Sequence, residues 1–285
     1  MDLIKRVHRK SSKLLLKGKG KLLNNGVNAF WWTKKKNFGD MFTPELFKHY
    51  GFTAVESWPN EADVVGVGSL YGMIPSSFKG TFLGTGLIQD EVIQFEQASF
   101  AAVRGEYTRK NLRLDASVPI GDFGLLAKKL IEKHSIKKKY SVGLIPHYVD
   151  IEHPWLCQMQ KYFGSNNCTL IDVRNSAKYV TKKVAECELI LSSSLHGLIV
   201  ADSLGIPNVW IELSNNVIGD GFKFKDYNSA IDYEQKVLKI KEQTLFSDVT
   251  NFITNKNKQK IESKINELDR IIIEQLTKGV VLDKR

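Results

Sequence analysis

The chain has 285 residues, of which 42% are hydrophobic and 25% are charged. This balance excludes a disordered chain, and no apolar run reaches the roughly 18 residues that a membrane-spanning helix needs. The first residues also lack the continuous apolar stretch of a secretory signal peptide. We therefore expect a globular, cytoplasmic protein.

The net charge of +10 is concentrated at one end of the chain. Residues 1–21 hold eight lysines and arginines against one acid, so they carry seven of the ten net positive charges. As a helix, this arm would be basic and amphipathic, which suits peripheral contact with the inner face of an anionic membrane. A solvated basic arm is the alternative. The rest of the chain is nearly balanced and has no nucleic-acid-binding motif, so we expect no nucleic-acid partner.

Short apolar runs alternate with amphipathic stretches through the middle of the chain. Uniformly apolar strands separated by helices are typical of parallel sheets that are covered on both faces. The sequence therefore predicts an α/β fold. The expected strands are residues 63–68, 81–86, 99–104, 140–146, 168–173, 187–192 and 207–213.

Helices and domain limits follow from the same pattern. Helices are expected at 44–50, 105–112 and 198–204, and apolar residues spaced by three or four predict a long amphipathic helix in the tail. The basic stretch 128–139 separates two groups of strands. We expect a basic arm (1–21), an N-terminal Rossmann-like domain (22–136), a C-terminal Rossmann-like domain (137–255) and a C-terminal helix (256–285), with a cleft between the two Rossmann-like domains.

The three cysteines indicate neither disulfides nor a metal site. Cys157, Cys168 and Cys187 form no CxxC pair, and no cysteine–histidine cluster has zinc spacing. We expect reduced thiols in or near the core and no bound metal.

A serine cluster and a histidine stand where an expected strand gives way to a helix. Residues Ser192–Ser194 follow the strand, and His196 and Gly197 precede the helix. Ligands of open α/β sheets bind beyond the carboxyl ends of the strands, and a helix N-terminus attracts anions. His196 could transfer protons near neutral pH. The alternative is a capped strand–helix junction whose histidine makes a local hydrogen bond.

This segment and four others, in the same order, resemble the polysaccharide pyruvyltransferase family. The match to the family's C-terminal signature is SSLHGLIVADSLGIP, at residues 193–207. The earlier matches are WWTKKKNFGD (31–40), VRGEYT (103–108), GDFGLL (121–126) and GLIPHY (143–148). Together the five segments reach from about Trp31 to Leu213.

The resemblance implies two Rossmann-like domains that face each other across a cleft, as in GT-B glycosyltransferases. It also implies transfer of pyruvate from phosphoenolpyruvate to sugar hydroxyls, as a ketal, in the biosynthesis of a cell-surface polysaccharide. The N-terminal domain would hold the acceptor, an oligosaccharide or a lipid-linked glycan, and the C-terminal domain would hold the donor. Phosphoenolpyruvate is a substrate, so no cofactor is expected.

The candidate catalytic residues are His196 and Asp40. His196 would transfer protons or bind the donor phosphate, and Asp40 would act as a base or bind sugar hydroxyls, unless it is a helix N-cap. Arg104 ends an apolar strand and is the candidate anion clamp, with an interdomain salt bridge as the alternative. The remaining candidates are Ser192, Ser193, Ser194, Leu195 and Gly197 for the donor, and Asn37, Trp31, Trp32 and His147 for the acceptor.

The chain departs from the family pattern at one position. Some family members have arginine two residues before the motif histidine, where this chain has Ser194. Arg174 or one of Lys34–Lys36 could supply the missing charge. We expect Asp122 to be structural at a turn, whereas Asp172 either faces the cleft or caps a helix.

Two other functions fit the same pattern. A GT-B-type glycosyltransferase would be stabilised by a nucleoside diphosphate rather than by phosphoenolpyruvate, and its fold would be nearly the same. A non-catalytic carbohydrate-binding relative would keep its function after His196→Ala.

Overall fold

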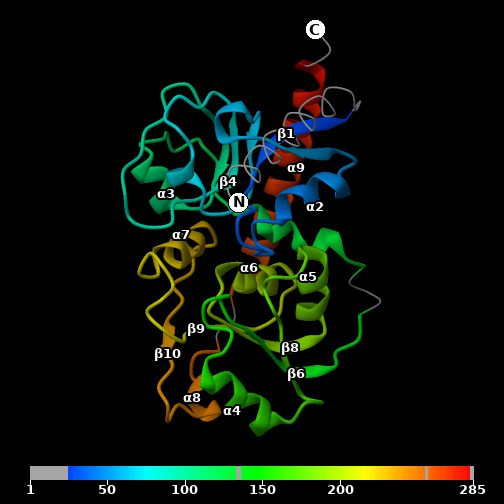
Figure 1. The fold of residues 1–285 in the computed structure, drawn as a ribbon, viewed down its shortest axis with the longest axis vertical. Helices are drawn as coiled ribbons and strands as arrows, with labels where there is room; N and C mark the ends of the chain where they lie inside the picture. Colours follow the sequence, from blue (N-terminus) through cyan, green and yellow to red (C-terminus); the bar gives the residue numbers. More distant parts are fainter. Residues whose placement is uncertain (1–24, 133–135, 254–255, 283–285) are drawn as a thin grey trace, which may run out of the picture.

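The computed structural model describes residues 25–132, 136–253 and 256–282 (Figure 1). The basic arm expected at residues 1–21 lies outside them. Within the described ranges, no helix combines the length and the apolar character needed to span a membrane.

The described chain forms two parallel sheets of five strands each. The first contains β1 (Gly26–Phe30), β2 (Thr53–Glu56), β3 (Val64–Val65), β4 (Thr81–Thr85) and β5 (Ser99–Val103), in the order β2-β1-β3-β4-β5. The second contains β6 (Tyr140–Ile145), β7 (Cys168–Leu170), β8 (Cys187–Ser192), β9 (Asn208–Glu212) and β10 (Val237–Lys239), in the order β10-β9-β8-β6-β7. All the strand pairs are parallel.

Both sheets have the same strand order when each is counted along its own part of the chain: 2-1-3-4-5. This is one of the orders of the doubly wound Rossmann-like folds. The predicted α/β fold with parallel sheets is therefore confirmed, whereas the likeness to GT-B enzymes and the domain limits stay predictions. The sequence analysis missed β1, β2 and β10, and the strand expected at 63–68 is reduced to β3.

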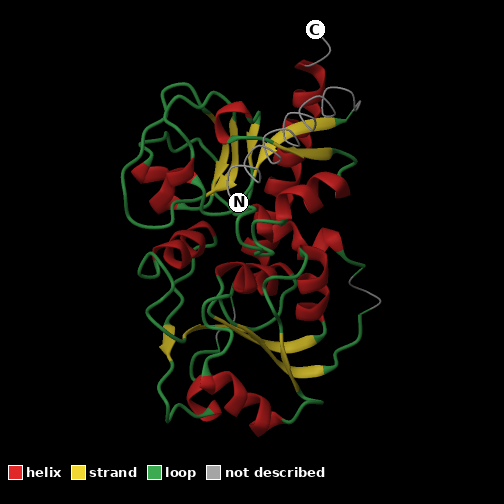
Figure 2. Ribbon diagram, viewed as in Figure 1, coloured by secondary structure: helices red, strands yellow, loops and turns green. Residues whose placement is uncertain are grey.

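Helices cover the faces of both sheets (Figure 2). The α-helices are α2 (Phe42–His49), α3 (Glu106–Asn111), α4 (Pro154–Phe163), α5 (Ala177–Ala185), α6 (Leu195–Ser203), α7 (Phe222–Ala230), α8 (Phe246–Thr250) and α9 (Lys258–Leu282). In the described part of the chain, three 3-10 helices accompany them: η1 (Pro59–Glu61), η2 (Tyr71–Met73) and η3 (Phe123–Leu130). All nine residues of α6 are buried, because this helix lies between the second sheet and η3.

The tail helix α9 returns to the first sheet (Figure 1). It packs on η3 and also contacts β1, β5 and α6. The apolar face expected from the sequence is buried in this interface; it consists of Ile261, Ile265, Leu268, Ile272 and Leu276. One apolar core therefore runs from the first sheet through η3 and α6 to the second sheet.

Polar contacts also join the two halves of the chain. The carboxylate of Glu45, on α2, accepts hydrogen bonds from the backbone N–H groups of Ala177 (2.8 Å) and Lys178 (2.6 Å) at the start of α5. The backbone N–H of Phe38 donates to the carbonyl of Val173 at 2.7 Å. The two bonds to Glu45 satisfy N–H groups that the start of α5 would otherwise leave free. The bond from Phe38 holds the 37–40 segment against the half of the chain that contains the second sheet.

Candidate active site

A cavity of about 230 Å³ lies where strands of both sheets end. Trp32 follows β1 and Ser69 follows β3, while His147 follows β6 and His196 follows β8. In each sheet the strand order reverses between these two strands, and such switch points are where doubly wound sheets bind ligands. The full lining is Trp32, Lys35, Asn37, Asp40, Ser69, Leu70, Met73, Ile88, His147, Tyr148, Ser194, Leu195, His196, Ile218 and Lys223.

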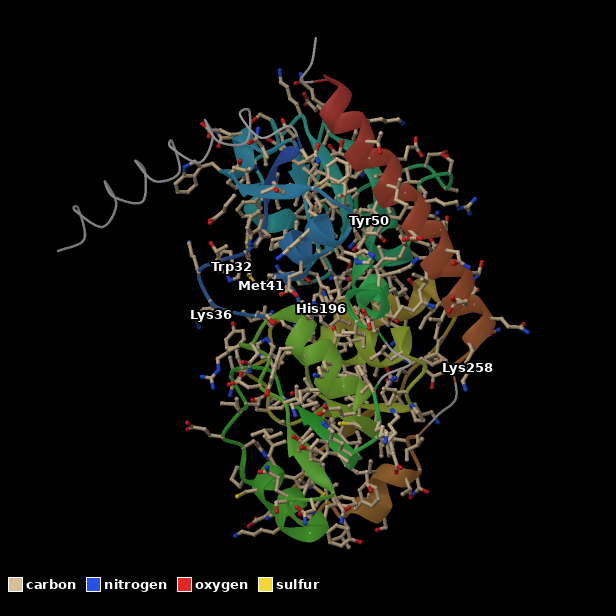
Figure 3. The ribbon with its side chains drawn as sticks, turned by 90° about the vertical axis from the view of Figure 1, so that its right-hand side faces the viewer. Trp32, Lys36, Met41, Tyr50, His196 and Lys258 are labelled. Atoms are coloured by element: carbon tan, nitrogen blue, oxygen red, sulfur yellow. The ribbon has the colours of Figure 1, made fainter. Side chains whose placement is uncertain are left out.

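His196 lies at the level where the two halves meet, with Met41 beside it and the Trp32–Lys36 segment at the edge of the view (Figure 3). The imidazole is packed against the rings of Phe38 and Phe42, at centroid distances of 6.2 and 6.1 Å. Gly39 completes the packing, because a Cβ there would lie 2.0 Å from His196 Nδ1. The NFGD segment therefore needs a glycine at this position, because the backbone passes directly over the imidazole.

The Nε2 atom of His196 faces a carboxyl group. It lies 3.8 Å from Oδ2 of Asp122, and neither of these buried atoms has a hydrogen-bond partner among the described residues. Oδ1 of Asp122 accepts from the backbone N–H of Gly124 at 2.8 Å, which fixes the carboxyl group at the start of η3. The 3.8 Å separation of Nε2 and Oδ2 is too long for a hydrogen bond, but a carboxylate so close to Nε2 would stabilise the imidazolium form of the ring by its charge.

Burial controls the protonation of this pair. Burial, reinforced by the positive charges of Arg104 and Lys223, lowers the pKa of His196 to about 3. Burial raises the pKa of Asp122 to about 6, against the opposing effects of the Gly124 N–H and Arg104. His196 is therefore neutral at pH 7, the form in which an imidazole accepts a proton. The sequence analysis treated Asp122 as structural, and the structure shows that it also faces the histidine.

Asp40 is a second buried carboxyl group in the cavity wall. Burial raises its pKa to about 7, although its hydrogen bond with Asn37 and the charge of Lys223 act in the opposite direction. The alternative assignment of Asp40 as a helix N-cap is wrong, because α2 begins after Met41 and has no side-chain cap. A carboxyl group with a pKa near 7 can donate a proton at physiological pH.

Two lysines give the cavity positive charge. Lys35 and Lys223 line it, and burial, followed by the charge of Arg104, lowers the pKa of Lys223 to about 8. Burial, Lys223 and Lys35, in that order, lower the pKa of His147 to about 4, so His147 is neutral at pH 7. Of the cations suggested as replacements for the missing arginine, Lys35 lines the cavity. No motif in the sequence around Lys223 indicates that it lines the cavity.

The serine cluster is divided between two functions. Ser194 and Leu195 line the cavity, and Ser194 is the N-cap residue of α6 without using its hydroxyl as a cap. The hydroxyl of Ser192 instead accepts from the Ser194 N–H (3.0 Å) and donates to the carbonyl of Ile145 (2.9 Å) or Ser194 (2.8 Å). Gly197 leaves room for that hydroxyl, since a Cβ would lie 2.3 Å from it. Ser192 and Gly197 therefore shape the turn and do not line the cavity.

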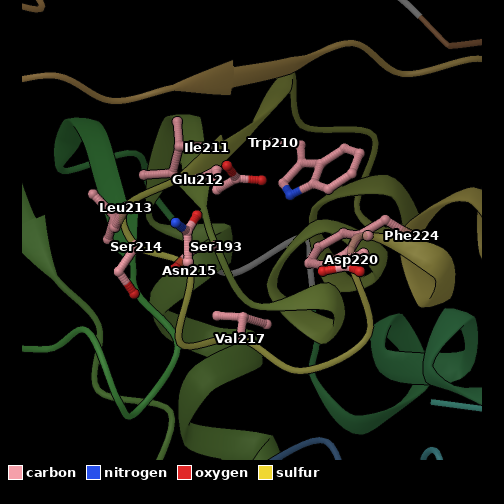
Figure 4. Close-up of a pocket in the computed structure, with 11 residues that line it drawn as sticks. Ser193, Trp210, Ile211, Glu212, Leu213, Ser214, Asn215, Val217, Asp220 and Phe224 are labelled. Atoms are coloured by element: carbon pink, nitrogen blue, oxygen red, sulfur yellow. The ribbon is translucent and has the colours of Figure 1, made fainter. Parts of the chain in front are cut away.

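Ser193 belongs to a smaller neighbouring cavity of about 90 Å³ (Figure 4). Its hydroxyl accepts from the His147 N–H at 2.8 Å and so holds the loop after β6. Trp210 and Phe224, stacked at 4.3 Å, form part of the wall of this smaller cavity. Ser193 thus holds the backbone of His147 through this hydrogen bond and does not line the larger cavity.

Arg104 is not an open anion clamp. Its guanidinium is fully buried, and Nε donates to Oδ2 of Asp226 at 2.9 Å. Nη1 donates to the hydroxyl of Ser69 at 2.7 Å, and Nη2 donates to the carbonyl of Leu87. Because Asp226 lies on α7, after the second sheet's β9, the geometry shows the alternative named for Arg104: a salt bridge between the two halves. Arg104 lies one layer behind the cavity wall, and Ser69 separates it from the cavity.

The remaining candidates are also sorted by position. Trp32 and Asn37 line the cavity, and Asn37 Oδ1 accepts from the Gly39 N–H at 3.3 Å. Trp31 is buried in the core and does not line the cavity. Outside the cavity, Arg174 is paired with Asp172 at 2.6 Å, which leaves neither side chain facing the site. In the described residues, no three His, Cys, Asp or Glu side chains gather closely enough to hold a metal ion.

The fold and the cavity define a class: a doubly wound α/β protein with a histidine–carboxyl pair, a second carboxyl group and lysines at the strand ends of both sheets. The sequence carries the matching family signature, because the polysaccharide pyruvyl transferase family model matches residues 19–215. The chain belongs to this family, as the sequence motifs predict.

Individual relatives match part of the chain. It is 34% identical over 194 residues to an uncharacterized protein of Acanthamoeba polyphaga mimivirus, which covers 63% of this chain and 66% of the relative. It is 27% identical over 212 residues to the succinoglycan biosynthesis protein ExoV of Rhizobium meliloti (strain 1021), which covers 71% of this chain and 64% of ExoV. The chain thus spans slightly less than two thirds of the length of both relatives.

Among solved structures, the chain is similar to a functionally uncharacterized protein of Klebsiella pneumoniae. The two are 17% identical, with a TM-score of 0.40, over 82% of this chain and 98% of the other.

Proposed function

We propose that the protein transfers pyruvate from phosphoenolpyruvate to two hydroxyls of a sugar, as a ketal, in the biosynthesis of a cell-surface polysaccharide. Family membership supports pyruvyl transfer, and the name of the relative ExoV supports a place in polysaccharide biosynthesis. The observation that carries the proposal is one cavity that holds neutral His196 beside Asp122, Asp40 with a pKa near 7, and two lysines. Action at the inner membrane surface, with residues 1–21 as the contact, is part of the same proposal.

The reaction sets clear demands on the site. The CH₂ carbon of phosphoenolpyruvate takes up a proton and becomes a methyl group, which makes C2 electrophilic. One sugar hydroxyl bonds to C2, a second hydroxyl replaces the phosphate, and the ketal closes. Of the two hydroxyl protons released, one balances the proton taken up by the methyl group and the other leaves with inorganic phosphate.

The two carboxyl groups and the histidine have separate tasks in this scheme. Asp40, partly protonated at neutral pH, donates the proton to the CH₂ carbon. His196, neutral and 3.8 Å from Asp122, takes the proton of the attacking hydroxyl, and the charge of Asp122 then stabilises the imidazolium that forms. The N-terminus of α6, which begins after Ser194, and the cavity lysines face the donor's negative charges. Trp32, Asn37 and His147, which line the same cavity, bind the sugar ring in this scheme.

The direct test is to incubate the purified protein with phosphoenolpyruvate and a pyruvyl-free glycan. We expect stoichiometric release of phosphate and an acetal methyl signal in the NMR spectrum of the glycan. A thermal shift with phosphoenolpyruvate, but not with a nucleoside diphosphate, separates this function from a glycosyltransferase. Folded protein that is stabilised only by the nucleotide and forms no ketal over a broad acceptor panel would contradict the proposal.

A further inference from the structure

Helix α7 contributes to the cavity although it lies beyond the part of the chain that defines the family. The family model ends at residue 215, whereas α7 begins at Phe222. Lys223, in its first turn, lines the cavity together with Ile218 from the preceding loop. The cavity thus has a positively charged wall that the family signature does not include.

The motif segment Arg104–Thr108 forms a socket for α7. The carboxylate of Asp226 accepts from Arg104 Nε (2.9 Å), from the Thr108 N–H (2.8 Å) and from the Thr108 hydroxyl (2.6 Å). Gly105 permits the close approach, because a Cβ there would lie 1.8 Å from the Asp226 carbonyl oxygen. The three donors and the glycine come from the motif segment whose Arg104 the sequence analysis names as the candidate anion clamp. In the structure this element holds α7 in place.

The ammonium group of Lys223 lies over the ring of Phe224, 5.6 Å from its centroid, and has no carboxylate or hydrogen-bonding partner in the described part of the chain. Among the described residues, no carboxylate lies within ion-pair distance (4.0 Å) of it and it makes no hydrogen bond. The groups that act on it electrostatically are Arg104 and Asp40, and it in turn acts on His147 and His196. A cation in the wall of a cavity that has a ring beside it but no counter-charge is costly to bury, and an anionic ligand would supply that counter-charge.

The position of Lys223 also answers the departure at Ser194. Both residues line the same cavity, and Ser194 offers a hydroxyl but no charge. A lysine binds phosphate as a point charge and tolerates several directions of approach. It can therefore act from α7 on an anion that sits at the N-terminus of α6.

We propose that Lys223, held in position by the contacts of Asp226 with Arg104 and Thr108, binds the phosphate group of the donor. The inference rests on the proposed function for the identity of the donor, phosphoenolpyruvate. It assigns Arg104 a positioning role, through α7, instead of direct contact with the donor.

Binding measurements on four proteins test the inference: wild type, Lys223→Gln, Lys223→Arg and Lys225→Gln. Lys225 is the matched control, because it is exposed on the same helix and does not line this cavity. The ligands are inorganic phosphate, phosphoenolpyruvate and a nucleoside diphosphate, titrated by calorimetry. We expect Lys223→Gln to weaken binding of phosphate and phosphoenolpyruvate about ten- to a hundredfold, as for a lost charged hydrogen bond. Lys223→Arg should bind within a few-fold of wild type, and Lys225→Gln should be unchanged.

The ligand-free melting temperature separates a binding lysine from a structural one. Removal of a cation that lacks a counter-charge, and with it one cation–π contact, should change the melting temperature of Lys223→Gln little, whereas loss of a lysine that stabilises the fold would lower it clearly. Ketal formation by wild type with unchanged phosphoenolpyruvate binding in Lys223→Gln would overturn the inference and leave the proposed function standing. Wild-type protein that binds the nucleoside diphosphate but neither phosphate nor phosphoenolpyruvate would overturn both.

Discussion

The two sheets have the same strand order but contribute different chemistry to the cavity. The second sheet delivers imidazoles: His147 follows β6 and His196 opens α6. The segments after the first sheet's strands deliver Asp40 and Ser69. A shared topology thus fixes where the strand ends meet, whereas the residues placed there decide what the site can do. The site is asymmetric, with a neutral imidazole from one half and a carboxyl group whose pKa is about 7 from the other.

Two residues of the second half, His196 on α6 and Lys223 on α7, are held in the cavity in different ways. His196 is fixed within the core, between Phe38, Phe42 and Gly39. Lys223 is held at the cavity by α7, whose Asp226 accepts hydrogen bonds from Arg104 and Thr108 of the first half. Disruption of one half's contribution should therefore affect chemistry, and disruption of the link should affect stability.

The largest expected effect is the loss of the imidazole. His196→Asn removes the proton acceptor, and general acid–base catalysis is worth about 10²–10⁴-fold, so ketal formation should fall by that factor. Phosphate release with phosphoenolpyruvate and glycan measures it. His153→Asn is the matched control, because His153 caps α4 away from the cavity and asparagine also caps helices. Equal activity in both variants would contradict the assignment.

The link between the halves comes next. Asp226→Ala leaves Arg104 as an uncompensated buried charge, and loss of one partner of a buried ion pair costs about 3–5 kcal/mol. Denaturant unfolding should show this loss of stability. Glu262→Ala removes the exposed partner of Lys128 and should cost about 1 kcal/mol or less. A loss of similar size in both variants would show that Asp226 is not the link.

The carboxyl group of Asp40 predicts a pH-dependent difference in stability. Its folded pKa of about 7 lies above the unfolded value of 3.8, so the folded state binds more protons between these values and ionisation destabilises it as the pH rises. Asp40→Asn lacks this penalty. Its free energy of unfolding should gain on wild type as the pH rises from about 4 to about 7 and stay level above that.

Asp172 supplies the control of opposite sign. Its hydrogen bond with Arg174 lowers its pKa below 3.8, so its contribution is present at neutral pH and is lost only as the pH falls through that lowered value. The difference between Asp172→Asn and wild type should therefore be constant from pH 5 to pH 8. If the difference in free energy of unfolding between Asp40→Asn and wild type were also constant over this pH range, the raised pKa of Asp40 would be refuted.

The smallest expected effect is at Arg174. Its ion pair with Asp172 is exposed, and such pairs contribute about 0–1 kcal/mol. Arg174→Gln should therefore change the free energy of unfolding by no more than that. Phosphoenolpyruvate binding should also be unchanged, because Arg174 is not part of the cavity. Weaker donor binding in this variant would show that Arg174, and not Lys223, replaces the missing arginine.

Prediction from sequence succeeded where the signal is local. The strands expected at 81–86, 140–146 and 187–192 are present because a continuous apolar run both forms and buries a parallel strand. The position of His196 at the start of α6 follows from the strand–helix junction itself. The short strand β3, with two residues, carried too little pattern to set its limits.

Prediction failed where the outcome depends on a distant partner. Arg104 ends its strand as expected, yet its charge is satisfied by Asp226, 122 residues along the chain. The sequence predicts Asp122 as a turn residue, and its hydrogen bond with the Gly124 N–H agrees with that prediction. The nearby His196 could not be predicted, because it belongs to the other half of the chain. No pattern around Lys223 indicates that α7 crosses to the first half.

The amino-acid sequence alone determined the α/β class, the family and the placement of a histidine at a helix start, because apolar periodicity and turn chemistry act over a few residues. Only the tertiary structure decided which charged side chains line the cavity and which, such as Arg104 and Asp226, form an ion pair outside it. Burial and ion pairing depend on the packing of segments more than a hundred residues apart. That packing raises the pKa of Asp40 to about 7, leaves Lys223 without a carboxylate partner among the described residues and removes Arg104 from the cavity.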